Sequence, residues 1–238
     1  MFFYDYWYIV LVMPCLILSL WASFNVKSTF KKYSKQYSSR RLTGAEAAQR
    51  VLSANGVYNV RIEQIGGDLS DHFDPKANVI RLSTDVYNST STAAIGVACH
   101  EAGHAVQYAQ SYAPMQLRAA IIPVTNIGSM LAMPLILVGL LLEAFIGIGS
   151  DATMMFVYLG IACFSLSLVF QLVTLPVEFN ASRRAMNTIA DANLLTSEEQ
   201  KGARKTLTAA ALTYVAATAV ALAQVLRLLL IFAGRNRD

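Results

Sequence analysis

Residues 96–106 read GVACHEAGHAV, and this stretch decides the local fold. His100 and His104 are four positions apart, and Glu101 follows the first histidine. Residues four apart share one face of a helix, so both imidazoles can reach a single ion. Neutral imidazole is a good zinc ligand, and the intervening glutamate can act as general base toward a metal-bound water. The pattern predicts a helix, ending near Ala109, that carries a hydrolytic site with one zinc ion.

The alternative is a solvent-exposed histidine pair beside an acid. The flanking residues Val97, Ala98, Ala105 and Val106 are apolar and favour a buried helix instead. A buried His-Glu-His cluster needs a partner that offsets its loss of hydration, and a metal ion is such a partner.

The apolar residues of the chain gather in blocks. Among its 238 residues, 55% are hydrophobic and 14% are charged, whereas soluble domains are about 25% charged. Four blocks, at 6–24, 121–142, 152–175 and 207–232, are each near the ~20 residues that a helix needs to cross a bilayer. The sequence therefore predicts a mostly α, polytopic membrane protein with about four transmembrane helices. The last block contains Arg227, and it either crosses the membrane or lies in the interface.

The basic residues predict the orientation. Six of them lie within 27–41 and five within 183–205, whereas the link at 143–151 has none. Cytoplasmic loops carry an excess of Lys and Arg, so segments 25–120 and 176–206 are expected in the cytoplasm. This predicts a multi-pass protein of the cytoplasmic membrane. The first basic stretch is interpreted as a collar near anionic lipid rather than as a nucleic-acid arm, and no nucleic-acid partner is expected.

The segment that precedes the second block has the pattern of a small α+β domain. Thr43 and Glu46 form a capping box before a helix that Gly56 ends. Residues 57–65 and 78–83 alternate as strands of a short sheet. We expect the strand at 78–83 to have an open edge that pairs with an extended peptide.

A catalytic zinc needs a third protein ligand, and several residues are candidates. Position 110 is Gln110, so the third histidine of the metzincin spacing is absent. Glu143 and Asp151 fall on the opposite membrane face in the predicted topology. Glu178 is the next acid after the chain returns, and it is the favoured ligand; its other reading is an acid stabilised by a helix dipole. His72 is the alternative ligand, a donor to the oxyanion, or a simple turn histidine.

These inferences divide the chain into five segments, in which Pro176 is expected to start the helix that supplies the third ligand. They are an N-terminal anchor at 1–24, a cytoplasmic segment with the histidine pair at 25–120, two transmembrane helices at 121–175, a cytoplasmic helix at 176–206, and a transmembrane or interfacial helix at 207–238.

Five motifs occur in an order that resembles a known family. They are TGAEAA at 43–48, LSDHFDP at 69–75, VIRLS at 79–83, ACHEAGHAVQ at 98–107 and PVEFNASRRA at 176–185. The set resembles the YugP-type, membrane-bound neutral zinc metallopeptidases of bacteria, over about residues 30–230. The resemblance implies a gluzincin-like peptidase with a zincin-like domain.

The resemblance also implies a role for each site residue. His100, His104 and Glu178 would bind the metal, and Glu101 would be the base. Membrane peptidases of the HtpX and CAAX-protease type often have an aspartate four residues after the ligating glutamate. This chain has Ser182 there, which can make one hydrogen bond but adds no charge.

The predicted function is hydrolysis of peptide bonds in membrane-associated proteins at the cytoplasmic face, with the bilayer and a peptide or protein substrate as partners. His72 or Tyr214 could contact the oxyanion or the substrate. One alternative is a site-2-type intramembrane protease, but the polar residues Gln107 and Gln110 near the motif argue against a spanning helix. The other is a non-catalytic zinc-binding membrane scaffold, which would not need Glu101. The sequence leaves the oligomeric state open.

Overall fold

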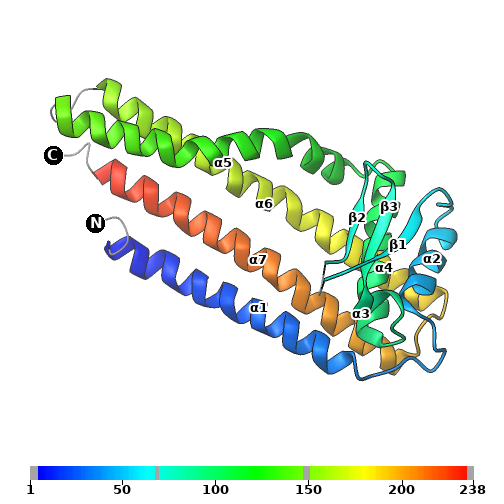
Figure 1. Ribbon diagram of the computed structural model, residues 1–238. Coiled ribbons are helices and arrows are strands. Elements are labelled where there is room, and N and C mark those ends of the chain that lie inside the picture. The colour runs from blue at the N-terminus through cyan, green and yellow to red at the C-terminus, as the bar shows by residue number, and fades with distance from the viewer. Residues whose placement is uncertain (1–4, 68–69, 147–150, 235–238) are drawn as a thin grey trace. The chain divides into compact units, whose positions relative to one another are not determined.

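The computed structural model describes residues 5–67, 70–146 and 151–234. Within them the chain is mostly helical with one three-stranded sheet, as predicted (Figure 1). The chain forms two compact units. The first comprises Met1–Trp21, Leu117–Leu175 and Tyr214–Asp238, and the second comprises Ala22–Gln116 and Pro176–Thr213. Residues 147–150 of the predicted outer link and 235–238 of the last segment lie outside the described residues.

Four long helices confirm the predicted number of candidate spans. They are α1 (Met13–Tyr33), which follows a π-helical turn at Tyr8–Val12, α5 (Ala113–Ile146), α6 (Asp151–Asp191) and α7 (Ser197–Gly234). Each is long and apolar enough to cross a membrane. Their orientation stays a prediction.

The first unit has a small apolar core and an ion pair between Arg227 and Asp5. Ile136, Val157 and Phe232 are among its buried residues. Arg227 Nη2 lies 2.5 Å from Asp5 Oδ2, and the guanidinium of Arg227 packs over the ring of Tyr8. The pair neutralises a charge that would be costly in an apolar setting.

The second unit contains the sheet, whose strands are β1 (Arg61–Ile65), β2 (His72–Asp74) and β3 (Val79–Ser83). The order is β1-β3-β2, with β1 parallel and β2 antiparallel to β3. The strand expected at 57–65 is shorter than predicted. The expectation of an open edge on the 78–83 strand was wrong, because β3 is central and β1 and β2 pair with its two sides.

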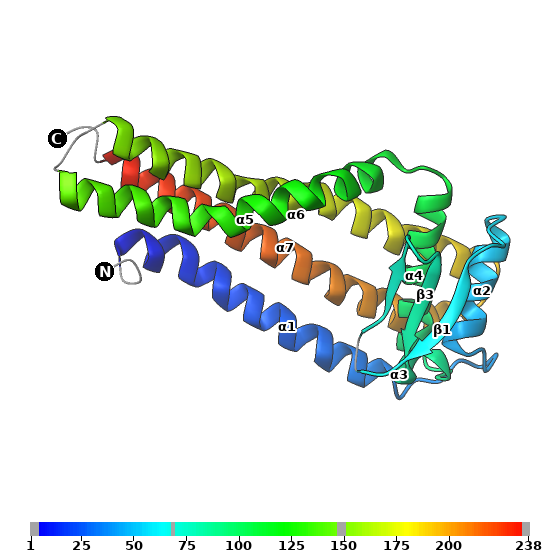
Figure 2. The same cartoon turned by 45° about the horizontal axis from the view of Figure 1, so that its top comes forward.

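Three helices complete this unit: α2 (Gly44–Ala54), α3 (Thr84–Tyr87) and α4 (Thr92–Ala109). The predicted capping box is present, because Thr43 Oγ1 accepts from Glu46 N and the Glu46 carboxylate accepts from Thr43 N. Apolar residues of α2, α4 and the sheet form one core, which includes Leu52, Ile80 and Ile95. Both views show the three strands side by side next to α4 (Figures 1 and 2).

Segment 176–206 differs from the single helix that was predicted. Pro176 lies inside α6, which runs without interruption to Asp191. A turn follows, and α7 begins at Ser197. Proline has no N–H and therefore removes one helical hydrogen bond, but neighbouring bonds keep the helix continuous.

Candidate metal centre

Helix α4 holds the two histidines on one buried face. Its first turn is capped by Ser91, whose side chain accepts from Ala94 N at 3.2 Å. Apolar and small residues cover most of the helix, as the flanking sequence predicted. The rings of His100 and His104 meet edge to face, with centroids 4.7 Å apart. Both imidazoles therefore lie next to the same small region of space.

Glu178 on α6 brings a carboxylate to this volume. Its Oε2 lies 3.3 Å from His100 Nε2 and 3.4 Å from His104 Nε2. The three side chains each offer one ligand atom within 4.8 Å of the others. Glu178 is only 3% exposed, so its charge is largely removed from water. Two imidazoles and one carboxylate are a donor set that zinc binds, and the residues present therefore fit the ion.

Close contact between two helices makes this convergence possible. A Cβ built on Gly103 of α4 would lie 2.7 Å from the carbonyl oxygen of Ala181 on α6. Any larger side chain at position 103 would separate the helices. Small residues on both sides thus let the backbone of α6 approach α4, one turn from Glu178.

The nitrogen on the far side of each imidazole also has a partner. His100 Nδ1 lies 3.0 Å from Ser182 Oγ, and His104 Nδ1 lies 3.0 Å from Gln107 Oε1. An amide oxygen only accepts, so His104 must donate from Nδ1 and keep the Nε2 lone pair for a metal. The predicted neighbour Ser182 is in place, whereas the role of Gln107 was missed.

Gln107 is itself fixed by the α6 backbone and by a second amide. It is fully buried, and its Nε2 donates to Val177 O at 2.8 Å and to Asn180 Oδ1 at 3.0 Å. Arg184 Nε donates to the same Asn180 oxygen at 2.7 Å. The two amide contacts define which atom of Gln107 is the oxygen, and the network holds His104 in one tautomer. Residues three apart are neighbours on a helix, so the spacing of His104 and Gln107 could have predicted their contact from the sequence.

Glu101, which follows His100 on α4, is a buried acid beside the cluster. It is 8% exposed, and within the described part of the chain its carboxylate has no hydrogen bond or ion pair. Burial alone would lower the pKa of His104, but a hydrogen bond that the protonated imidazole donates to Glu178, together with the charges of Glu101 and Glu178, raises it overall. The same field favours a bound cation.

Asp71 is a second acid close to the base. Its Oδ1 accepts from Ser83 N at 2.7 Å. Burial is the main reason that the pKa of Asp71 is raised, and the negative charge of Glu101 adds to the effect. Sequence reasoning missed this residue, because only the β2–β3 pairing brings it near α4.

Comparison with known proteins agrees with this donor set. A family model described as "putative neutral zinc metallopeptidase" matches residues 8–233. The chain belongs to this family. It is also 48% identical over 232 residues to a Bacillus subtilis (strain 168) protein described as "Putative membrane protease YugP", which covers 97% of this chain and 99% of that protein. No solved structure matches the chain. The resemblance inferred from the motifs is confirmed.

Two residues with predicted contacts lie outside this cluster of three side chains. His72 is an exposed residue of β2, and its Nδ1 lies 2.8 Å from Ser70 O. It is not among the three side chains that converge. Tyr214 belongs to the other compact unit. Contact of either residue with an oxyanion or a substrate stays a prediction.

Proposed function

We propose that this protein is a zinc-dependent endopeptidase with a zincin-like domain, acting on membrane-associated proteins at the cytoplasmic face. One ion would be held by His100, His104 and Glu178. The observation that carries the proposal is the position of Glu178 Oε2, within 3.4 Å of the Nε2 atoms of both histidines. The orientation rests on the basic residues of segments 25–120 and 176–206.

Glu101 would act as the general base and then as the general acid. When bound, zinc would supply Lewis acidity to the scissile carbonyl and to the attacking water. Glu101 takes one proton from that water as its oxygen bonds to the carbonyl carbon. The carboxyl group then gives the proton to the nitrogen as the C–N bond breaks, so the products are a free acid and a free amine.

The other residues of the site orient its ligands. Gln107 keeps His104 protonated at Nδ1, and Ser182 Oγ accepts the corresponding proton of His100. Neither residue adds charge near the metal, so the site depends on Glu178 alone among its ligands for neutralisation.

An extended substrate would use β2. Among the described residues, this strand pairs with β3 on one side only, and it lies beside α4, where Phe73 contacts Tyr108 with ring centroids 5.8 Å apart. A strand edge offers N–H and C=O groups to a peptide backbone. The free side of β2 therefore replaces the 78–83 strand as the proposed substrate edge.

The test is paired measurement of bound zinc and of hydrolysis on the full-length protein in nanodiscs, with a membrane-tethered reporter peptide. Glu101→Gln should retain zinc and lose about 10²–10⁴-fold in hydrolysis rate. His100→Ala should lose both. Glu198→Gln, an exposed acid paired with Lys201, is the matched control and should change neither.

Two results would contradict the proposal. One is hydrolysis by Glu101→Gln at the wild-type rate. The other is a wild-type protein that binds zinc stoichiometrically and cleaves no tethered peptide, which would support the zinc-binding scaffold instead.

A further inference from the structure

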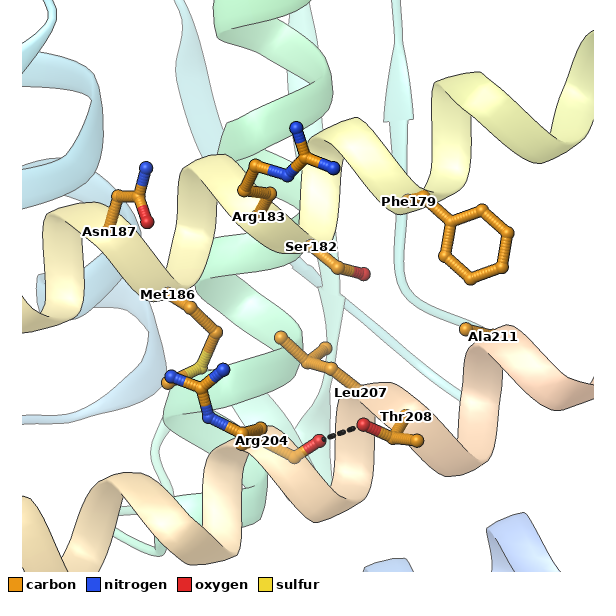
Figure 3. Close-up of a pocket in the computed structure, with 9 residues that line it drawn as sticks. All are labelled: Phe179, Ser182, Arg183, Met186, Asn187, Arg204, Leu207, Thr208 and Ala211. Atoms are coloured by element: carbon orange, nitrogen blue, oxygen red, sulfur yellow. Dashed lines mark hydrogen bonds between the residues drawn. The ribbon is translucent and has the colours of Figure 1, made fainter.

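A separate pocket lies between α6 and α7 in the second unit, with a volume of about 340 Å³ (Figure 3). Its lining includes Phe179, Arg183 and Asn187 from α6, and Arg204 and Ala211 from α7. None of these five residues belongs to the proposed metal site. The only lining residue that touches that site is Ser182, which contacts His100 at Nδ1, the nitrogen that faces away from Glu178.

The pocket has a polar end and an apolar end. Figure 3 shows Asn187 and Arg204 toward one end and Phe179 and Ala211 toward the other, with Arg183 between them on α6 and its guanidinium directed away from α7. Thr208 lies between them, and its hydroxyl is already used, because it donates to Arg204 O at 2.8 Å. A ligand that fits this lining has a polar, anionic part and an apolar part.

Neither arginine of the lining is neutralised by an acid in the part of the chain that the structure describes. Arg183 and Arg204 are exposed, and neither guanidinium has a hydrogen bond or an ion pair among the described residues. Arg184, next to the first, shows the contrast: it donates to Asn180 and to Gln110. The lining thus carries one unpaired guanidinium on each helix, and an anion toward which both long side chains turn would be held from two sides; phosphate suits the hydrogen-bonding geometry of arginine.

The positions of the polar and apolar lining residues along the two helices favour a lipid as the ligand. Residues 152–175 of α6 contain no charged residue, and Phe179 is nearer to this run in sequence than Arg183 or Asn187. On α7, Ala211 is nearer to the apolar run, and Arg204 precedes it. In both helices the apolar end of the pocket is thus next to a candidate span, as the acyl chains of a bound lipid would be.

We propose that this pocket binds the phosphate group of an anionic phospholipid through Arg183 and Arg204, with the start of an acyl chain against Phe179 and Ala211. The site is independent of hydrolysis. Basic pockets between membrane helices are a known way of binding lipid headgroups. A soluble phosphate shares the headgroup chemistry but would leave the apolar end unused.

The experiment is a titration of the detergent-solubilised, full-length protein with dioctanoyl phosphatidylglycerol, followed by native mass spectrometry to count bound lipids. Parallel titrations use phosphatidylcholine of the same chain length and inorganic phosphate. One phosphatidylglycerol should bind in preference to phosphatidylcholine. The double variant Arg183→Gln/Arg204→Gln should bind it about 25-fold more weakly, at about fivefold for each arginine.

Two further variants separate the pocket from general surface charge. Lys201→Gln/Lys205→Gln removes the same charge from α7 outside the pocket and should keep the wild-type affinity. Thr208→Trp fills the pocket without changing charge and should weaken binding. Far-ultraviolet circular dichroism and zinc content verify that each variant is folded.

Three outcomes would overturn the proposal. The first is equal loss of affinity in the two double variants, which indicates non-specific electrostatics. The second is arginine-dependent binding of inorganic phosphate without any preference for phosphatidylglycerol, which assigns the pocket to a soluble anion. The third is wild-type affinity in the folded Thr208→Trp variant.

Discussion

Replacement of Gln107 by leucine tests whether the amide network controls metal binding. Leucine is close in size to glutamine, but it offers no acceptor to His104 Nδ1 and no donor to Val177 O. The imidazole can then rotate or adopt the other tautomer, in which Nε2 carries the proton and cannot bind a metal.

The expected magnitude follows from the contacts that are lost. Removal of the partner of a metal-binding histidine weakens metal affinity by about 10- to 100-fold, or about 1.4–2.7 kcal/mol. The buried donors and acceptors left without Gln107 should lower the free energy of unfolding by about 1–2 kcal/mol. Asn180 retains one partner, because Arg184 still donates to its side-chain oxygen.

The assay is competition for zinc against a calibrated chelator, with thermal unfolding of the metal-free protein measured in parallel. Gln107→Glu separates the two effects. Its carboxylate still accepts from His104 Nδ1 but cannot donate to Val177 O. It should therefore retain zinc affinity within about threefold while it loses stability.

Gln116→Leu is the matched control, because Gln116 is exposed and lies outside the network. It should change neither zinc affinity nor the unfolding temperature. The reasoning is refuted if folded Gln107→Leu binds zinc as tightly as the wild type. It is also refuted if Gln107→Glu and Gln107→Leu lose the same affinity, since loss of the acceptor would then not be the cause.

Three other changes probe the packing and the charges of the second unit. Gly103→Ala places a methyl group against Ala181 O and should lower the free energy of unfolding by about 1–3 kcal/mol. It should also weaken zinc binding, measured by chelator competition. Ala109→Val changes an exposed residue of the same helix and should alter neither stability nor zinc affinity. The pKa of Asp71 is raised in the folded protein above its ordinary value of 3.8. Ionisation of this carboxyl group at higher pH therefore lowers the free energy of unfolding, and the loss of stability disappears as the pH falls toward 3.8. Asp71→Asn should therefore unfold at higher denaturant than wild type at pH 7, with a difference that shrinks toward pH 4; an unchanged or lower midpoint at pH 7 would contradict this. Burial raises the pKa of the Cys99 thiol, so mass spectrometry should find it alkylated only after unfolding, and rapid labelling of the native protein would be the contrary result.

The parts that sequence reasoning predicted were those with a local period or a local motif. The spacing of His100 and His104 placed both imidazoles on one helix face, and runs of apolar residues predicted four long helices. Glu178 was reached by counting membrane crossings, and its position beside both histidines agrees with that reasoning.

The remaining features depend on contacts between residues that are distant in sequence. Gln107 donates a hydrogen bond to Val177, which is 70 residues away in the sequence, and no periodic pattern predicts such a contact. The strand β2 has only three residues, and it is defined by its pairing with β3 rather than by its own composition. The continuity of α6 through Pro176 was missed because proline is a common helix start as well as a tolerated interior residue in membrane helices.

The proline inside α6 has a mechanical consequence for this helix. Bilayers differ in thickness, and a spanning helix adjusts to a mismatch by tilting. Pro176 lacks the N–H that would stiffen the helix two residues before Glu178, so this is where bending costs least. The helix can therefore bend at this proline, so that the apolar residues before it tilt while Glu178 keeps its place beside His100 and His104.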